Sequence, residues 1–203
     1  MGHYPVIARE GIVFVLICAI AAFAILHYVG FYESLVLWAA CLLLVVVFRD
    51  PDREIPAVPL AVVSPADGKV TSISVAHDPY LARESVRIVI QMNPYGVYTT
   101  RSPIEGKVLE PPNIPEVHGA PHGVWLQADE LDDVVLVMNR GPLRNTPRCY
   151  VRFGERVGQG QRCGFIHLGG QVELYLPTTT RTLVTPGDLV RSGSDVIAKL
   201  VHA

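Results

Sequence analysis

The sequence predicts an N-terminal transmembrane helical hairpin followed by an all-β domain that resembles a barrel-sandwich hybrid. Three observations lead to this prediction. Half of the 203 residues are hydrophobic, and they are concentrated near the N-terminus. After Phe48 the chain changes to short apolar runs separated by glycine and proline, and two sequence patterns in this part recur. We therefore expect a membrane anchor in residues 1–49 and a β domain in residues 50–203.

Two apolar segments predict the hairpin. Residues 11–29 carry no formal charge apart from His27, and as a helix they would extend roughly 28 Å, which is close to the hydrocarbon thickness of a bilayer. Residues 34–48 are also uncharged but shorter. Because the link between the two segments has only four residues, 30–33, we expect the segments to pair with both ends on one side.

Alternatives remain for each apolar segment. A cleaved signal peptide is the main alternative for the first, but Arg9 and Glu10 flank it and no small-residue cleavage site precedes a mature start. The second is short for a span, so it could instead lie in the interface or re-enter. The positive-inside bias of Arg9, Arg49 and Arg53 favours the inner membrane with the β domain on the cytoplasmic side. Either geometry places that domain at the membrane surface, with membrane lipid as a partner.

Charge and cysteine content exclude other classes of protein. The net charge of −2 and the lack of a basic stripe with interleaved aromatic residues argue against nucleic acid as a partner. Cys18 and Cys41 lie inside the apolar segments, so the four cysteines do not suggest a disulfide framework. Cys149 and Cys163 are isolated, and we expect core residues rather than metal ligands.

The β domain is expected to contain two related β-hairpin units. SPADGKV at residues 64–70 recurs as SPIEGKV at 102–108, and GERVGQG at 154–160 recurs as GDLVRSG at 187–193. The second pattern resembles the hairpin repeats of biotinyl and lipoyl domains. A swinging-arm carrier is disfavoured, because no lysine has the Met-Lys or Asp-Lys context of such carriers. The candidates are Lys69, Lys107 and Lys199. We expect short strands at residues 62–63, 70–75, 86–91, 134–138, 172–176 and 196–201.

A family resemblance covers nearly the whole chain. Residues 164–177, GFIHLGGQVELYLP, closely resemble the GLIRFGSRVDLYLP signature of the short phosphatidylserine decarboxylases. Further stretches resemble family signatures in family order: residues 7–11, 48–56, 64–70 and 101–108. The resemblance implies decarboxylation of phosphatidylserine by a pyruvoyl cofactor, which forms when the chain is cleaved between the Gly and the Ser of the signature.

The reactive residue of that signature is missing here. Gly170 stands at the Ser position, after Gly169. In the family the Ser hydroxyl attacks the preceding carbonyl, and elimination from the resulting ester leaves the pyruvoyl group. Glycine has neither the oxygen nor a Cβ, so we expect that no pyruvoyl group can form at Gly170 and that no other cofactor or metal replaces it.

Other positions of the family site are altered as well. Asp67 matches the Asp of the family's SPADG motif, which the resemblance implies as support for the base of self-cleavage; the alternative is a turn residue that caps its own backbone. Tyr98 stands at the position of the family's His, and Gly96 at that of its Asp. A phenol with a pKa near 10 is a poor base at neutral pH. The stretch 113–133 also looks shorter than in the family, which should alter the substrate pocket.

Few residues could restore the chemistry. His118 and His122 are four apart, but the Gly and Pro residues around them disfavour a helix, so the spacing does not place both on one helical face for a metal. His167 is expected to be a surface or strand residue, and Cys163 is seven positions from the cleavage site. Three hypotheses follow. The first is a catalytically inactive homologue that acts as a structural or accessory subunit of a membrane complex or as a phospholipid binder. The second is an active phosphatidylserine decarboxylase of phosphatidylethanolamine synthesis, and the third a different enzyme that uses these histidines.

Overall fold

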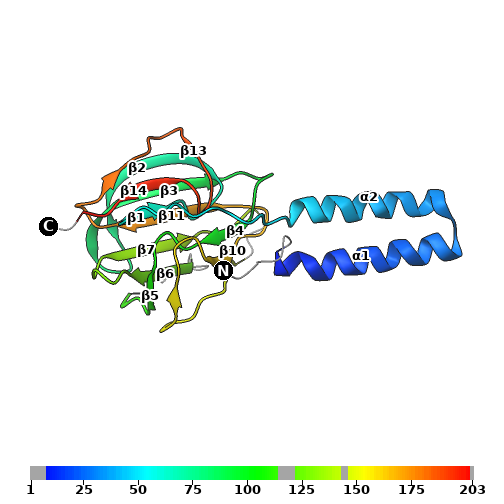
Figure 1. Cartoon of the computed structure of the whole chain (residues 1–203), viewed down its shortest axis with the longest axis horizontal. Coiled ribbons are helices and arrows are strands. Elements are labelled where there is room, and N and C mark those ends of the chain that lie inside the picture. Colours follow the sequence, from blue (N-terminus) through cyan, green and yellow to red (C-terminus); the bar gives the residue numbers. More distant parts are fainter. Residues whose placement is uncertain (1–7, 114–121, 143–145, 202–203) are drawn as a thin grey trace. The chain divides into compact units, whose positions relative to one another are not determined.

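The structure is a computed structural model that describes residues 8–113, 122–142 and 146–201 (Figure 1). The chain divides into two compact units, Met1–Asp52 and Arg53–Ala203. The first contains two helices and the second is built from antiparallel β-strands. The predicted fold class, a helical hairpin followed by an all-β domain, is confirmed.

The first unit pairs helix α1 (Arg9–Tyr28) with helix α2 (Phe31–Val47). Of the described helices, α1 is the one that is long and apolar enough to cross a membrane, through Glu10–Tyr28, while α2 is a shorter apolar helix. The two helices are joined by reciprocal contacts: the Cys18 thiol lies 3.5 Å from the carbonyl oxygen of Leu37, and the Cys41 thiol lies 3.9 Å from that of Val15. Small polar side chains of this kind let apolar helices approach closely.

The second unit contains the strands. In chain order the described strands are β1 (Ala61–Val63), β2 (Gly68–Asp78), β3 (Arg83–Met92), β4 (Thr99–Arg101), β5 (Gly106–Leu109), β6 (His122–Gln127), β7 (Asp133–Met138), β8 (Arg148–Cys149), β9 (Arg156–Val157), β10 (Arg162–Phe165), β11 (Gln171–Leu176), β12 (Arg181–Thr182), β13 (Leu189–Val190) and β14 (Val196–Lys199).

These strands form three sheets. The largest has eight strands in the order β13-β2-β3-β11-β7-β6-β5-β9, and two smaller sheets have the orders β1-β14-β12 and β4-β10-β8. Every expected strand is present, with shifted ends. β2 extends to Asp78 because it forms a long hairpin with β3, in which the Asp78 carboxylate accepts the backbone N–H of Tyr80 at 2.9 Å. β14 ends two residues earlier than expected, at Lys199.

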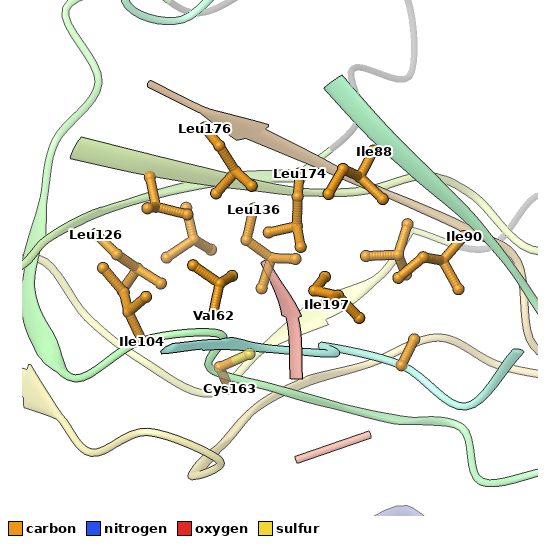
Figure 2. Close-up of a cluster of buried hydrophobic side chains, with 14 of the residues drawn as sticks. Val62, Ile88, Ile90, Ile104, Leu126, Leu136, Cys163, Leu174, Leu176 and Ile197 are labelled. Carbon is orange, nitrogen blue, oxygen red and sulfur yellow. The ribbon is translucent and has the colours of Figure 1, made fainter. Parts of the chain in front are cut away.

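The main core lies on one face of the eight-stranded sheet (Figure 2). Leu174 of β11 is paired with Ile88 of β3 on one side and with Leu136 of β7 on the other. All three side chains are fully buried. Val62 of β1 and Ile197 of β14 pack against them from a small sheet. Burying each such side chain contributes about 1.5–3 kcal/mol, so this layer is the main source of the stability of the β domain.

The two echoes in the sequence are two structural repeats. We define the first repeat as residues 64–95 with 185–193, and the second as residues 102–131 with 152–160. Val190 of β13 pairs with Gly68 of β2 in the first, just as Val157 of β9 pairs with Gly106 of β5 in the second.

Backbone and side-chain hydrogen bonds repeat as well. The Gly193 N–H donates to the Ser64 carbonyl at 2.8 Å, and the Gly160 N–H donates to the Ser102 carbonyl at 2.8 Å. The Ser64 and Ser102 hydroxyls each donate to the carbonyl two residues later, again at 2.8 Å. The predicted pseudo-symmetry is therefore confirmed. Lys69 and Lys107 lie within its paired strands, not at an exposed hairpin turn.

Candidate site at the Gly169 and Gly170 turn

Gly169 and Gly170 form a buried turn that leads into β11, here named the 169–170 turn. The Gly170 carbonyl accepts two hydrogen bonds from β3, one from the Met92 N–H at 2.8 Å and one from the Gln91 side-chain amide at 3.1 Å. Leu168 and Gly169 both have positive φ, 58° and 74°. Such a φ at a leucine costs about 1 kcal/mol, so the surrounding contacts must hold the turn in this shape.

The space around Gly170 is tight but not closed. A Cβ atom placed on Gly170 would lie 3.0 Å from Cγ2 of Ile166 and 3.2 Å from the carbonyl oxygen of Asn139. Its φ lies outside the left-handed region, so the backbone itself would accept a serine. Small shifts of these neighbours would admit the side chain. The turn thus lacks the hydroxyl group of a serine, not the conformation that a serine needs.

Gly141 lies against the carbonyl group of the turn. A Cβ atom on Gly141 would come within 2.5 Å of the carbonyl oxygens of both Gly169 and His167. No larger residue fits there without moving the backbone. Gly141 is therefore part of the wall that positions the Gly169 carbonyl, the group at the bond that the family resemblance marks for cleavage.

Tyr98 lies beside the turn, and its hydroxyl group already donates a hydrogen bond within the protein. Its buried hydroxyl donates to the Pro94 carbonyl at 2.5 Å, and its ring meets Phe165 edge to face at 6.2 Å. Its own carbonyl accepts the Ile166 N–H at 3.0 Å. Burial, and to a smaller extent Tyr95, raises the pKa of Tyr98 above its ordinary value. At neutral pH this phenol is uncharged and cannot take a proton from a nearby group.

Asp67 is mostly buried, and both of its carboxylate oxygens are engaged. Oδ2 forms an ion pair with the Arg53 guanidinium at 2.7 Å, and Oδ1 accepts the backbone N–H of Ser192 at 2.7 Å. These partners are distant in sequence, so the alternative in which Asp67 only caps its own turn does not describe the contacts. A Cβ atom on Gly96 would lie 3.6 Å from the Asp67 Cβ, which makes Gly96 the neighbour of this carboxylate.

The loop that follows β3 brings the predicted positions together. The Asn93 N–H donates to the Asp67 carbonyl at 3.0 Å. One residue earlier, the Met92 N–H donates to the Gly170 carbonyl. The Tyr98 carbonyl accepts the N–H of Ile166, which precedes the turn. The four positions identified from the sequence, Asp67, Gly96, Tyr98 and Gly170, therefore lie around residues 92–98.

The remaining candidates do not join this group as catalytic residues. His118 lies outside the described residues, and of His122 only the backbone, in β6, is described. His167 is half-buried, and its ring packs edge to face on Phe165 at 5.0 Å. Cys163 belongs to the core, where burial raises the pKa of its thiol to about 12. Cys149 is half-buried, and its thiol contacts the Val151 carbonyl at 3.4 Å. Within the described parts of the chain, no group of three His, Cys, Asp or Glu residues could hold a metal ion.

A carboxylate network near the turn was not anticipated from the sequence. Glu173 accepts hydrogen bonds from Arg87 at 2.8 Å, from Asn139 at 2.8 Å and from the Tyr175 hydroxyl at 3.0 Å. Burial favours the neutral acid, but the bonds from Arg87, Asn139 and Tyr175 outweigh it, so the pKa of Glu173 is lowered. Because the Asn139 carbonyl faces Gly170, the network reaches the site.

Sequence inspection also missed four residues that shape the site: Arg53, Gln91, Gly141 and Ser192. Arg53 lies in the family-like segment 48–56, which was the one available signal, but there it suggested only membrane topology. The other three act through backbone groups or an amide whose partners are far away in the sequence. Their roles depend on strand register and leave no local pattern.

Comparison with known proteins identifies the family of this chain. The family model described as phosphatidylserine decarboxylase matches residues 42–132 and 122–198. The phosphatidylserine decarboxylase proenzyme of Burkholderia multivorans (strain ATCC 17616 / 249) is 36% identical over 208 residues, covering 97% of both chains. The proenzyme of Paraburkholderia xenovorans (strain LB400) is 35% identical over 97% of this chain and 98% of its own. That of Nitrosomonas eutropha (strain DSM 101675 / C91 / Nm57) is 33% identical over 97% of this chain and 96% of its own. The chain therefore belongs to the phosphatidylserine decarboxylase family.

Proposed function

We propose that this chain is a membrane-anchored, catalytically inactive member of its family. It would act as a structural or accessory subunit of a membrane complex or as a phospholipid binder. The observation that carries the proposal is Gly170 at the position of the serine from which the family makes its pyruvoyl group. Without a side-chain oxygen the chain cannot attack the Gly169 carbonyl, so the residues present do not fit this cofactor.

The surrounding groups support the same proposal. Self-cleavage needs a group that takes the proton of the attacking hydroxyl. The Tyr98 hydroxyl donates a hydrogen bond to the Pro94 carbonyl, so it is not free to accept that proton. The Asp67 carboxylate is bound by Arg53 and by the Ser192 N–H. Gly96 supplies no acid beside Asp67. The loss at Gly170 is thus accompanied by losses among the groups that would assist it, and groups of one catalytic unit fail together.

We also propose how the chain is placed. Residues 1–49 would anchor residues 50–203 to the inner membrane, with the β domain on the cytoplasmic side. The apolar length of α1 supports insertion, and the positive-inside bias of Arg9, Arg49 and Arg53 supports the orientation. A C-terminal green fluorescent protein fusion would fluoresce in this orientation. A periplasmic alkaline phosphatase fusion that is active at the same position would contradict it.

Intact mass spectrometry of the full-length protein tests the loss of processing. We expect one species near 22.2 kDa and no release of carbon dioxide from phosphatidylserine. The Burkholderia multivorans proenzyme, purified in the same detergent, is the matched control. Two fragments that divide near Gly169 would contradict the proposal and favour the alternative, an active decarboxylase, which the identity over nearly the whole chain supports.

Isolation of the native protein tests the non-catalytic role. We expect partner proteins or phospholipid to remain bound in fixed proportion after mild solubilisation. A solitary chain that retains neither would count against both forms of the role.

A further inference from the structure

A groove of about 600 Å³ opens beside the candidate site, at the end of the eight-stranded sheet that carries β13. Two of its wall residues are Gln91 and Met92, the residues that bind the Gly170 carbonyl. Opposite them lie Leu189 and Arg191. The groove therefore shares a wall with the 169–170 turn but is built from the first repeat.

The groove has a cationic floor. Lys69 pairs directly with Leu189 on one side and with Gln91 on the other, so the three side chains project from the same face of the sheet. All three are exposed. Lys69 forms no ion pair with any residue in the described ranges. Arg191 is near Asp195, at 3.7 Å between Nη2 and Oδ1, so one acid is set against two cations.

We call two exposed apolar side chains the rim of the groove: Leu189, which lines it, and Tyr95, which follows the lining residue Pro94 in the chain. Tyr95 is 88% exposed and Leu189 is 80% exposed, although both belong to an otherwise well-packed β domain. Pro94, next to Tyr95, lines the groove itself. Exposed aromatic and aliphatic side chains beside lysine and arginine are the combination that enters the interface of an anionic bilayer.

The second repeat has the same backbone but different side chains at the equivalent positions, so the cationic and apolar character of the groove is not imposed by the fold. Lys107 pairs with Gln127 as Lys69 pairs with Gln91. Two and three residues further along the chain, Asp129 and Glu130 stand where the groove has Asn93 and Pro94. Arg156 stands at the position of Leu189 and is bound to Asp129 at 2.7 Å. The same backbone therefore carries an ion pair between an arginine and an acid in one repeat and a cationic groove in the other.

We infer that the groove of the first repeat binds the phosphodiester group of an anionic phospholipid. Lys69 and Arg191 would hold the phosphate, while Tyr95 and Leu189 enter the lipid around it. This inference rests on the proposed phospholipid-binding function and assigns it a site. The proposed anchor would keep the groove near the bilayer, so modest affinity for one headgroup would suffice.

The test is a titration of the full-length protein in neutral detergent with soluble dihexanoyl phosphatidylglycerol. Dihexanoyl phosphatidylcholine and inorganic phosphate are the comparison probes. We expect phosphatidylglycerol to bind at least about tenfold more tightly than either. The double variant Lys69→Gln, Arg191→Gln should lose this difference. Lys107→Gln removes the equivalent lysine of the second repeat and should change the affinity by less than about twofold.

The rim distinguishes lipid from free phosphate. Tyr95→Ser with Leu189→Ser should weaken phosphatidylglycerol binding and leave phosphate binding unchanged. Equal affinity of the double cation variant and the parent protein would overturn the inference, and so would phosphate that binds as tightly as phosphatidylglycerol. Thermal unfolding of each variant checks that it is folded. Intact mass of the same samples keeps the two proposals separate, because chain cleavage would refute inactivity whatever the groove binds.

Discussion

Where the second repeat ends, the chain passes from β6 to β7 through a tight turn at Leu131 and Asp132. The equivalent place next to the first repeat is filled by Gly169 and Gly170, which come from elsewhere in the chain. The Ala128 N–H donates to the Asp132 carbonyl at 2.9 Å, just as Met92 donates to Gly170 at 2.8 Å. Leu131 and Gly169 have similar positive φ values, 68° and 74°. One closure is a local hairpin, and the other joins segments nearly eighty residues apart. The candidate site thus occupies the non-local copy of a repeated turn.

The acidic residue of the repeated motif also differs between the two repeats, in its burial and in its ion pair. Asp67 in the first repeat has a side chain that is 15% exposed and bound to Arg53 at 2.7 Å. Glu105 in the second has a side chain that is 69% exposed and lies 4.0 Å from Arg156. Equivalent backbone does not give equivalent roles, because burial decides how strongly a carboxylate depends on its partner.

The largest expected effect is a loss of stability when the close approach of two strands is blocked. Comparing the two repeats would show whether both depend on this approach. A Cβ atom on Gly68 would lie 2.1 Å from the Gln91 carbonyl oxygen, and one on Gly106 would lie 2.3 Å from that of Gln127. Gly68→Ala and Gly106→Ala should therefore each lower the free energy of unfolding by about 3 kcal/mol or more. Denaturant unfolding of the full chain in detergent measures this. Gly158→Ala is the control, because its Cβ would meet only Oε1 of Gln161 at an ordinary 3.8 Å, and it should change the free energy of unfolding by less than about 0.5 kcal/mol. If only one of the two variants lost this much stability, the two repeats would not depend equally on the close strand approach.

The next effect separates the two acids. Asp67→Asn removes the charge that holds Arg53 and should cost about 1.5 kcal/mol, while the matched change Glu105→Gln should cost less than about 0.5 kcal/mol. The same unfolding measurement compares them. Equal costs would show that burial at Asp67 has no energetic consequence.

The turn itself provides a third test. Gly170→Ser should fit with a loss of about 1 kcal/mol, because its Cβ meets Ile166 and Asn139 at 3.0 and 3.2 Å. The variant should still run as one uncleaved chain by intact mass, since Tyr98 and Asp67 are engaged elsewhere. Gly158→Ser is the matched control. Fragments from Gly170→Ser alone would mean that the remaining groups still support processing.

The smallest effect concerns the central strands between the repeats, where Glu173 of β11 meets Asn139 at the end of β7. The pKa of Glu173 is lowered in the folded chain. The ionised carboxylate therefore stabilises the fold above the unfolded-state pKa of about 4.3, and this contribution is lost as the pH falls through the folded-state value.

We expect the parent protein to lose about 1 kcal/mol more stability than Glu173→Gln between pH 6 and pH 3. Unfolding curves across this range measure the difference, and Glu84→Gln, on the same sheet, is a control that should follow the parent. Parallel pH profiles of the parent and Glu173→Gln would show that the network does not stabilise the ionised form.

Much of the molecule was predictable from local sequence. Uninterrupted apolar length predicted the two helices, and the recurrence of SPADGKV and SPIEGKV predicted the two repeats. The resemblance at 164–177, and with it the expectation that Gly170 and Tyr98 depart from the family pattern, likewise needed no structure, because a family motif keeps its spacing along the chain. The extent of β2 and the end of β14 were not predicted well, since strand ends depend on the neighbouring strand.

The sequence by itself determined the two apolar helices, the β class, the family and the glycine at position 170, because each is a property of residue type and spacing. Only the tertiary structure decided that Arg53 holds Asp67, that Gly141 lies against the Gly169 carbonyl, and that β3 binds Gly170. The physical reason is strand register: antiparallel pairing brings together groups far apart in the chain, and one residue of shift would exchange the buried and exposed faces.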